Sequence, residues 1–69
     1  MVKLTIRQKL IGCRKMLNLT QEDMAKLLNI NRITYHKKEK KPETFTLEES
    51  SIIQKYFDDN LENAPRIFF

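Results

Sequence analysis

The chain has 69 residues, with 13 Lys and Arg against 9 Asp and Glu, one cysteine and one histidine, so its formal net charge is +4. A chain of this length forms one small domain with a modest core, which leaves little room for a deep catalytic pocket. One cysteine, Cys13, excludes an internal disulfide, and one histidine leaves no cluster with metal-ligand spacing. No stretch approaches the roughly 20 apolar residues of a membrane span. We therefore expect a single cytoplasmic domain over residues 1–69 that is not an enzyme and uses no membrane segment, metal or cofactor.

The charge is unevenly distributed along the chain. Residues 1–42 hold 11 Lys and Arg and 3 Asp and Glu, whereas residues 43–69 hold 2 and 6. The first part thus carries a net +8 and the second a net −4. This asymmetry favours one surface for a polyanion and another that avoids it. On composition alone, an ordinary solvated surface is the alternative.

Helical periodicity appears throughout the chain, and the alternation of a half-buried strand does not persist anywhere. Thr5 is expected to cap a first helix that ends near residue 17. Its apolar face is predicted to consist of Ile6, Leu10, Cys13 and Leu17. Gly12 costs about 1 kcal/mol inside a helix relative to Ala, and its presence indicates a close helix contact. Cys13 is interpreted as a small core residue.

Two short helices follow with few residues between them. Thr20 caps the first, and Asp23 three residues later completes a variant of the capping box. Asn29 is expected to end this helix in the left-handed conformation, and Asn31 caps the next one, which runs to residue 38 or 39. Tyr35 is expected to face the core. The outer face of this third helix is predicted to present Arg32, Ile33, His36 and Lys37.

A loop and a fourth helix complete the predicted bundle. Pro42 disfavours helix at the residue before it, so residues 40–44 are expected to form a loop. Thr46 and Glu49 form a full capping box for the last helix, which is expected to break at residues 58–60. Its core face is predicted to consist of Leu47, Ile52, Ile53, Tyr56 and Phe57.

The tail, residues 60–69, is predicted to be a short fifth helix or an arm. It ends in Ile67, Phe68 and Phe69, which are costly to leave in water. Two alternatives therefore stay open: the tail folds back on the core, or it meets another protein.

Residues 19–39 read LTQEDMAKLLNINRITYHKKE, and two helices joined by a short turn with a basic second helix form a helix-turn-helix. The stretch resembles the helix-turn-helix of the phage repressor and Cro family, whose wording is close to L-T-Q-E-E-L-A-x-x-L-G-V-S-x-x-T-I-S-x-x-E. The direct matches are Leu19, Thr20, Gln21, Glu22, Ala25, Leu28, Thr34 and Glu39. The chain departs from the pattern at Asn29 and Lys41, where Gly is usual, and at Lys38, where an apolar residue is usual.

The resemblance covers residues 4 to about 57 and implies an all-α, compact four- to five-helix bundle with its helix-turn-helix at residues 20–39. It also implies roles at the matching positions. The implied base-edge contacts in a DNA major groove are Asn31, Arg32, Ile33 and Lys37. The implied phosphate contacts are Gln21, Thr34, His36, Lys40 and Lys41. Arg14 and Glu39 match a pair that links the first helix to the end of the third. The chemistry agrees, because Arg bonds bidentately to guanine and Ile touches the thymine methyl group.

The leading hypothesis is a sequence-specific transcriptional regulator, implied by the resemblance to act in a phage lysis–lysogeny switch. It would bind double-stranded operator DNA as a homodimer, because one module contacts too little DNA for strong specificity. The alternative is an anti-repressor or modulator of a temperate phage or prophage that binds a larger phage repressor protein. Its candidate surface is the acidic last helix together with Ile67, Phe68 and Phe69.

Overall fold

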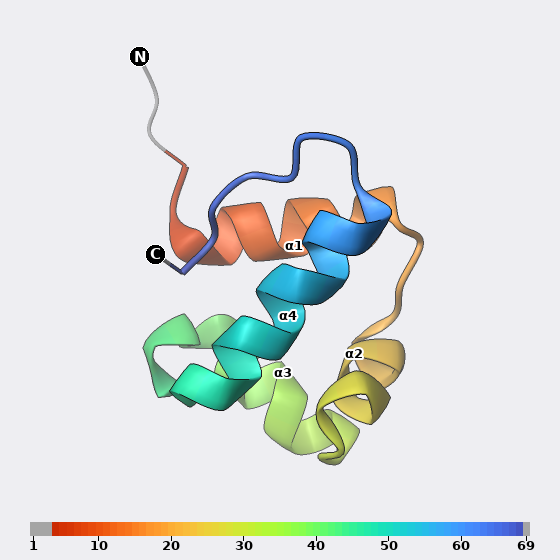
Figure 1. Ribbon diagram of the computed structural model, residues 1–69. Coiled ribbons are helices and arrows are strands. Elements are labelled where there is room, and N and C mark those ends of the chain that lie inside the picture. The colour runs from red at the N-terminus through yellow and green to blue at the C-terminus, as the bar shows by residue number, and fades with distance from the viewer. Residues whose placement is uncertain (1–3, 69) are drawn as a thin grey trace.

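Each α-helix in the described part of the chain begins after a side chain that accepts a hydrogen bond from one of its free backbone N–H groups. The computed structural model describes residues 4–68. Its helices are α1 (Ile6–Met16), α2 (Gln21–Leu28), α3 (Arg32–Lys40) and α4 (Leu47–Asn60), with a 3-10 turn, η1 (Pro42–Thr44), between α3 and α4 (Figure 1). No strand occurs within residues 4–68. The all-α class predicted from the periodicity is confirmed.

The four helix starts use the caps that the sequence predicts. Thr5, Thr20 and Thr46 each accept a hydrogen bond from the backbone N–H three residues later, and the side chain at that position accepts one from the cap's N–H. Asn31 Oδ1 accepts from the backbone N–H of Thr34 at 2.8 Å. Each such cap contributes about 1 kcal/mol. Together they fix the residues at which α1, α2, α3 and α4 begin.

The turn between α2 and α3 is closed by an asparagine in the left-handed region. Asn29 has φ 57° and ψ 44°, a conformation that asparagine tolerates better than most residues. Its replacement of the usual Gly therefore leaves the turn intact.

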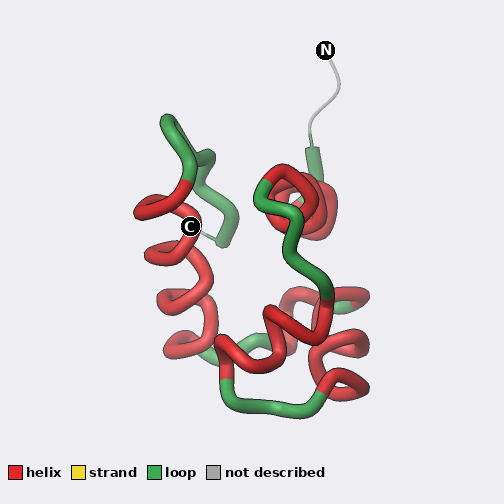
Figure 2. Tube along the Cα trace, turned by 90° about the vertical axis from the view of Figure 1, so that its right-hand side faces the viewer, coloured by secondary structure: helices red, strands yellow, loops and turns green. Residues whose placement is uncertain are grey.

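The helices are arranged at two ends of the molecule, and α4 connects these ends. Figures 1 and 2 show α1 and the tail at one end, α2 and α3 at the other, and α4 running between them. The largest fully buried side chains come from all four α-helices: Tyr35, Phe57, Leu10, Met24 and Ile53. Each contributes about 1.5–3 kcal/mol by leaving water. Most of the stability of α3 therefore comes from its neighbours, since Tyr35 is its one buried apolar residue.

The tail folds back on the core and is held there by a buried glutamine. Gln54 donates Nε2 to the Pro65 carbonyl at 2.9 Å and accepts the Ile67 backbone N–H at 2.8 Å. Ile67 is 2% exposed, and the half-buried Phe68 packs edge-on against Phe45 with ring centroids 5.6 Å apart. Of the two open alternatives, the folded-back tail is thus the one observed, without a fifth helix at residues 61–68. Phe69 lies outside the described residues.

Three local predictions are wrong. Ile6 and Leu47, expected on core faces, are 40% and 71% exposed, and each is the first residue of its helix. Gly12 was expected at a close helix contact, but a Cβ added there meets nothing within 4 Å. The last two helices also run to Lys40 and Asn60, slightly beyond their predicted ends.

Among residues 4–68, no helix has both the length and the apolar character needed to cross a membrane.

Candidate nucleic-acid interface

The outer face of α3 exposes the cations that the sequence analysis placed there. Four residues of this face are exposed: Arg32, Ile33, His36 and Lys37. Ile33 is 62% exposed to solvent although its side chain is apolar. The cap residue Asn31 and the following Lys40 and Lys41 are also exposed, whereas Thr34 is half-buried. The predicted base-edge candidates therefore share one helix and its cap. Their predicted contacts with DNA stay predictions.

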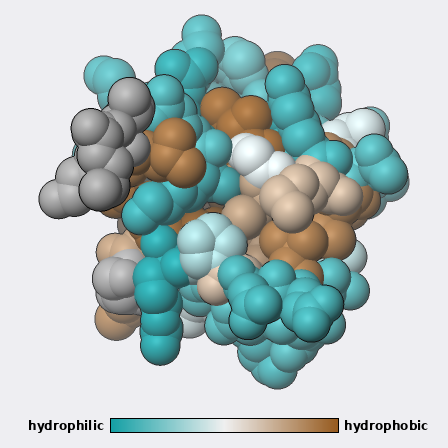
Figure 3. Space-filling model, turned by 90° about the horizontal axis from the view of Figure 1, so that it is seen from above, coloured by the Kyte–Doolittle hydropathy of each residue, from teal (hydrophilic) through white to brown (hydrophobic). Residues whose placement is uncertain are grey.

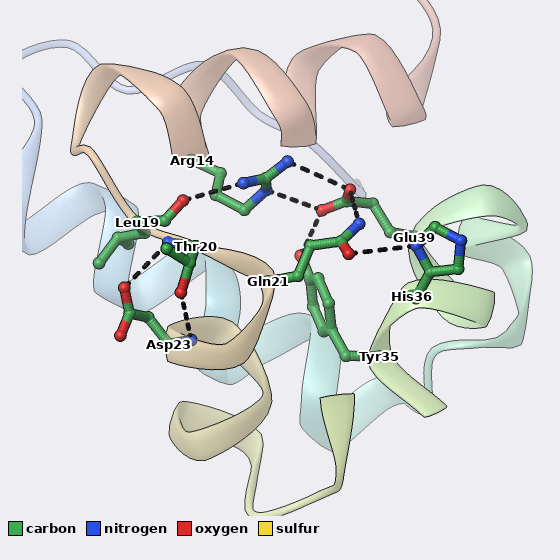
Figure 4. A network of polar contacts seen from close by, with 8 residues as sticks. All are labelled: Arg14, Leu19, Thr20, Gln21, Asp23, Tyr35, His36 and Glu39. Carbon is green, nitrogen blue, oxygen red and sulfur yellow. Dashed lines mark hydrogen bonds and ion pairs between the residues drawn. The ribbon is translucent and has the colours of Figure 1, made fainter. Parts of the chain in front are cut away.

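The inner face of α3 is fixed by one buried carboxylate. Glu39 is 3% exposed and accepts from Arg14 Nε at 3.0 Å and Nη2 at 3.4 Å. It also accepts from the Tyr35 hydroxyl at 2.8 Å and from Gln21 Nε2 at 3.0 Å (Figure 4). Arg14 Nη1 meanwhile donates to the Leu19 carbonyl at 2.9 Å. The predicted Arg14–Glu39 pair is present, and Glu39 joins α1, α2 and α3 at one point.

Tyr35 takes part in this network as a permanent donor. Burial raises the pKa of its phenol far above the ordinary value, and the adjacent Glu39 carboxylate raises it further. The hydroxyl therefore keeps its proton and its bond to Glu39. Sequence reasoning placed Tyr35 in the core but missed this bond, although the spacing of four residues places the two side chains on one helical face.

The side chain of Gln21 makes its hydrogen bonds within the protein, to Glu39 and His36. It is half-buried, its Nε2 donates to Glu39, and its Oε1 lies 3.1 Å from His36 Nδ1. The first turn of α2 also carries exposed Glu22 and Asp23. Hydrogen bonding to the backbone and side chain of Thr20 lowers the pKa of Asp23, so its negative charge persists and opposes a phosphate at this turn. The phosphate contact expected of Gln21 stays a prediction.

Lys38 holds the second half of α3 against α4. Its Nζ lies 2.7 Å from Glu49 Oε1 and 5.9 Å from the centroid of the Phe45 ring. Burial opposes ionisation of Glu49, but the Lys38 hydrogen bond and the Thr46 backbone N–H lower its pKa overall. The lysine thus fills a position where the family pattern has an apolar residue, by covering an aromatic ring and pairing its charge. The departure from the pattern is evident in the sequence, whereas the ion pair between Lys38 and Glu49 is evident only in the structure.

Other chemistry is sparse in the described part of the chain. Residues 4–68 contain no group of three or more His, Cys, Asp or Glu side chains arranged to hold a metal ion. Cys13 is buried, and burial raises the pKa of its thiol. A buried thiol of raised pKa is a poor nucleophile, which agrees with its interpretation as a core residue.

Comparison of the chain with family models, with curated proteins and with solved structures gives no match. Its function is therefore inferred from the exposed face of α3 and the network beneath it.

Proposed function

We propose that the chain is a sequence-specific, double-stranded-DNA-binding transcriptional regulator that inserts the exposed face of α3 into the major groove. The observation that carries this proposal is the combination of two faces on one helix. The outer face presents Arg32, Ile33 and Lys37 to solvent, while the inner face is fixed by the buried Glu39 network. A cationic helix that is rigidly held and uncovered matches what groove recognition needs.

The dimensions and chemistry of α3 support a groove contact. Nine residues make a helix about 14 Å long, and a B-DNA major groove is about 12 Å wide and accepts one helix. Arg32 and Lys37 supply donors for guanine N7 and O6, and Ile33 supplies apolar contact for a thymine methyl. Lys40 and Lys41 extend the charge toward phosphates, which position a protein without specifying sequence.

The acidic part of the chain supports one orientation. In α4, Glu48, Asp58 and Asp59 are exposed, and a polyanion is repelled from that surface. The net negative charge of α4 and the cationic outer face of α3 together favour an orientation with α3 toward the DNA.

We infer that two copies act together. The chain measures 34 × 22 × 21 Å along its principal axes. Two half-sites one helical turn apart are separated by about 34–36 Å. Two copies that touch along a short dimension have centres about 22 Å apart, so modules placed at half-sites with that spacing do not clash. The resemblance to the phage repressor and Cro family suggests control of a lysis–lysogeny switch, by steric blocking of a promoter.

A binding measurement with matched variants tests the proposal. Fluorescence anisotropy would compare the duplex that flanks the gene with a random duplex of equal length, at two salt concentrations. Arg32→Ala should weaken binding to the flanking duplex, whereas Lys55→Ala, which removes the same charge from an exposed position on α4, should not. Equal affinity for both duplexes would contradict sequence-specific recognition.

One observation favours a second candidate, a modulator that binds a larger repressor protein. An apolar groove of about 210 Å³ lies between α1 and the tail, lined in part by Gly12, Met16, Leu61 and Pro65. It sits at the end of the molecule away from α3 (Figures 1 and 2), and Figure 3 shows apolar surface there between hydrophilic rims. Met16 is 71% exposed. A mixed complex with a larger repressor on size exclusion, together with no sequence preference on DNA, would favour this candidate.

A further inference from the structure

The orientation of the Gln21 amide is determined by the buried carboxylate beside it. Glu39 is paired with the Arg14 guanidinium, and a carboxylate has acceptor atoms only. The amide atom facing Glu39 at 3.0 Å must therefore be Nε2, which donates. Exchanging the amide oxygen and nitrogen would place two acceptors against each other. The amide oxygen consequently points to the other side, toward His36.

The Gln21 amide oxygen in turn determines where His36 carries its hydrogen. Gln21 Oε1 is 3.1 Å from His36 Nδ1, and an amide oxygen only accepts. Nδ1 must therefore donate, so a neutral His36 carries its hydrogen on Nδ1 and a lone pair on Nε2. The second ring nitrogen points away from Gln21 (Figure 4). Within residues 4–68 the ring is hydrogen-bonded through Nδ1 alone, and His36 is exposed on the outer face of α3.

We propose that Glu39, acting through Gln21, fixes His36 as a hydrogen-bond acceptor on the recognition face, so that Nε2 reads the exocyclic amine of adenine or cytosine. The proposal rests on the proposed DNA-binding function and adds a specificity-determining residue to it. In the major groove, adenine N6 and cytosine N4 are donors, whereas guanine and thymine present acceptors. His36 would thus select A or C over G or T at one position of one strand.

The fixed hydrogen also argues against the phosphate contact expected for His36 from the family resemblance. A phosphate oxygen is an acceptor, and the lone pair of neutral Nε2 repels it. A phosphate contact would need a doubly protonated ring, whereas the base contact uses the neutral ring that the Gln21 bond already orients. Arg32 and Lys37, which are donors, then read complementary acceptors beside it.

The hydrogen position is measurable on the free protein. His36 is the one histidine of the chain, so a protein prepared without a histidine tag gives a single pair of imidazole nitrogens in a long-range ¹H–¹⁵N spectrum. At about pH 8.5, Nδ1 should show the protonated ¹⁵N shift and Nε2 the unprotonated shift. Gln21→Met, which keeps the aliphatic stem but removes both bonds, should shift the population toward Nε2–H. Glu22→Gln on the same turn should leave it unchanged. A wild-type ring protonated on Nε2 would overturn the proposal.

Base reading is tested by selection from a pool of randomised duplexes, with wild type and His36→Lys in parallel. Lysine has donors only, so the preferred base at one position should change from A or C to G or T, while the other positions stay the same. A matched base contact corresponds to about a 5- to 150-fold difference in affinity between right and wrong bases. Identical base preferences in the two selections, with affinity changed evenly, would make His36 a phosphate or bystander residue and overturn the proposal.

The two experiments separate the two ways of failing. If neither protein enriches any sequence, the proposed DNA-binding function fails and base reading fails with it, whatever the tautomer. If the wild type enriches a sequence but His36→Lys selects the same one, DNA binding stands and the role of His36 is refuted.

Discussion

Replacing Glu39 with alanine should destabilise the chain more than any surface change. Four N–H or O–H donors from three residues converge on this carboxylate, which is 3% exposed. Removing one partner of a buried ion pair costs about 3–5 kcal/mol, because the remaining charge stays buried without compensation. Arg14 keeps 13% side-chain exposure and its bond to Leu19, so the lower part of that range applies to the ion pair. The Tyr35 hydroxyl, fully buried, adds about 1–3 kcal/mol for its lost acceptor.

A loss of about 4 kcal/mol is large for this chain. Native stability of roughly 0.05–0.15 kcal/mol per residue gives about 3–10 kcal/mol for a domain of this size. Urea denaturation followed by far-UV circular dichroism measures the change, and Glu62→Ala, an exposed acid outside the helices, is the control, expected within about 0.5 kcal/mol of wild type. A double change of Arg14 and Glu39 to methionine should cost less than the two single changes together. If Glu39→Ala stays within about 0.5 kcal/mol of wild type, the network does not hold α3.

Three further outcomes are expected. Arg32→Ala should cost about 1–3 kcal/mol in DNA binding and relax specificity at one base pair. Lys40→Ala should weaken binding to all sequences evenly and reduce the slope of its salt dependence by about 1. Anisotropy titrations measure both effects, and the reverse pattern would exchange the roles of the two residues. The pKa of Glu49 is lowered in the folded chain. The carboxylate therefore contributes its full stability above its unfolded pKa of about 4.3, and this contribution is lost as the pH falls through the folded pKa. Glu49→Gln should flatten the decline of the urea midpoint at acid pH, and an unchanged decline would refute a role of the ion pair. Ile67→Ala should cost about 2–5 kcal/mol by thermal denaturation because it empties core volume, while the exposed Leu47→Ala should cost less than about 1 kcal/mol; equal losses would mean that the tail does not complete the core.

Local structure was predictable where a short rule decides it. A Thr or Asn cap needs its partner three residues away, so residues such as Thr20 and Asn31 set the helix starts without reference to the rest of the fold. The left-handed backbone conformation of Asn29 was predictable because an asparagine directly after the last apolar residue of a helix commonly ends the helix in this way. The burial of residues at the helix starts was harder to predict. Periodicity assigns Ile6 and Leu47 to the apolar face of a helix, but it does not show whether a neighbouring element extends far enough to cover them.

Contacts between distant residues were the part that sequence reasoning missed. Arg14 and Glu39 were paired only through a family resemblance, and nothing local indicated that Gln21 would join them. Gln54 looks like any polar residue of an amphipathic helix, yet it binds the tail through backbone groups of residues 65 and 67. Lys38 stands where the family pattern has an apolar residue, and its partner Glu49 was assigned only the role of a capping residue, so nothing in the sequence indicated that the two would pair. A side chain with two partners is visible only once the helices are placed.

The claim that the outer face of α3 is the nucleic-acid surface is tested most directly by mapping backbone amide shifts of the ¹⁵N-labelled chain during titration with its best-bound duplex. The largest changes should fall on residues 31–41, with little change across α4 and in the tail residues 61–68. Changes concentrated on α4 and the tail, with residues 31–41 unmoved, would contradict the account and identify a different binding surface.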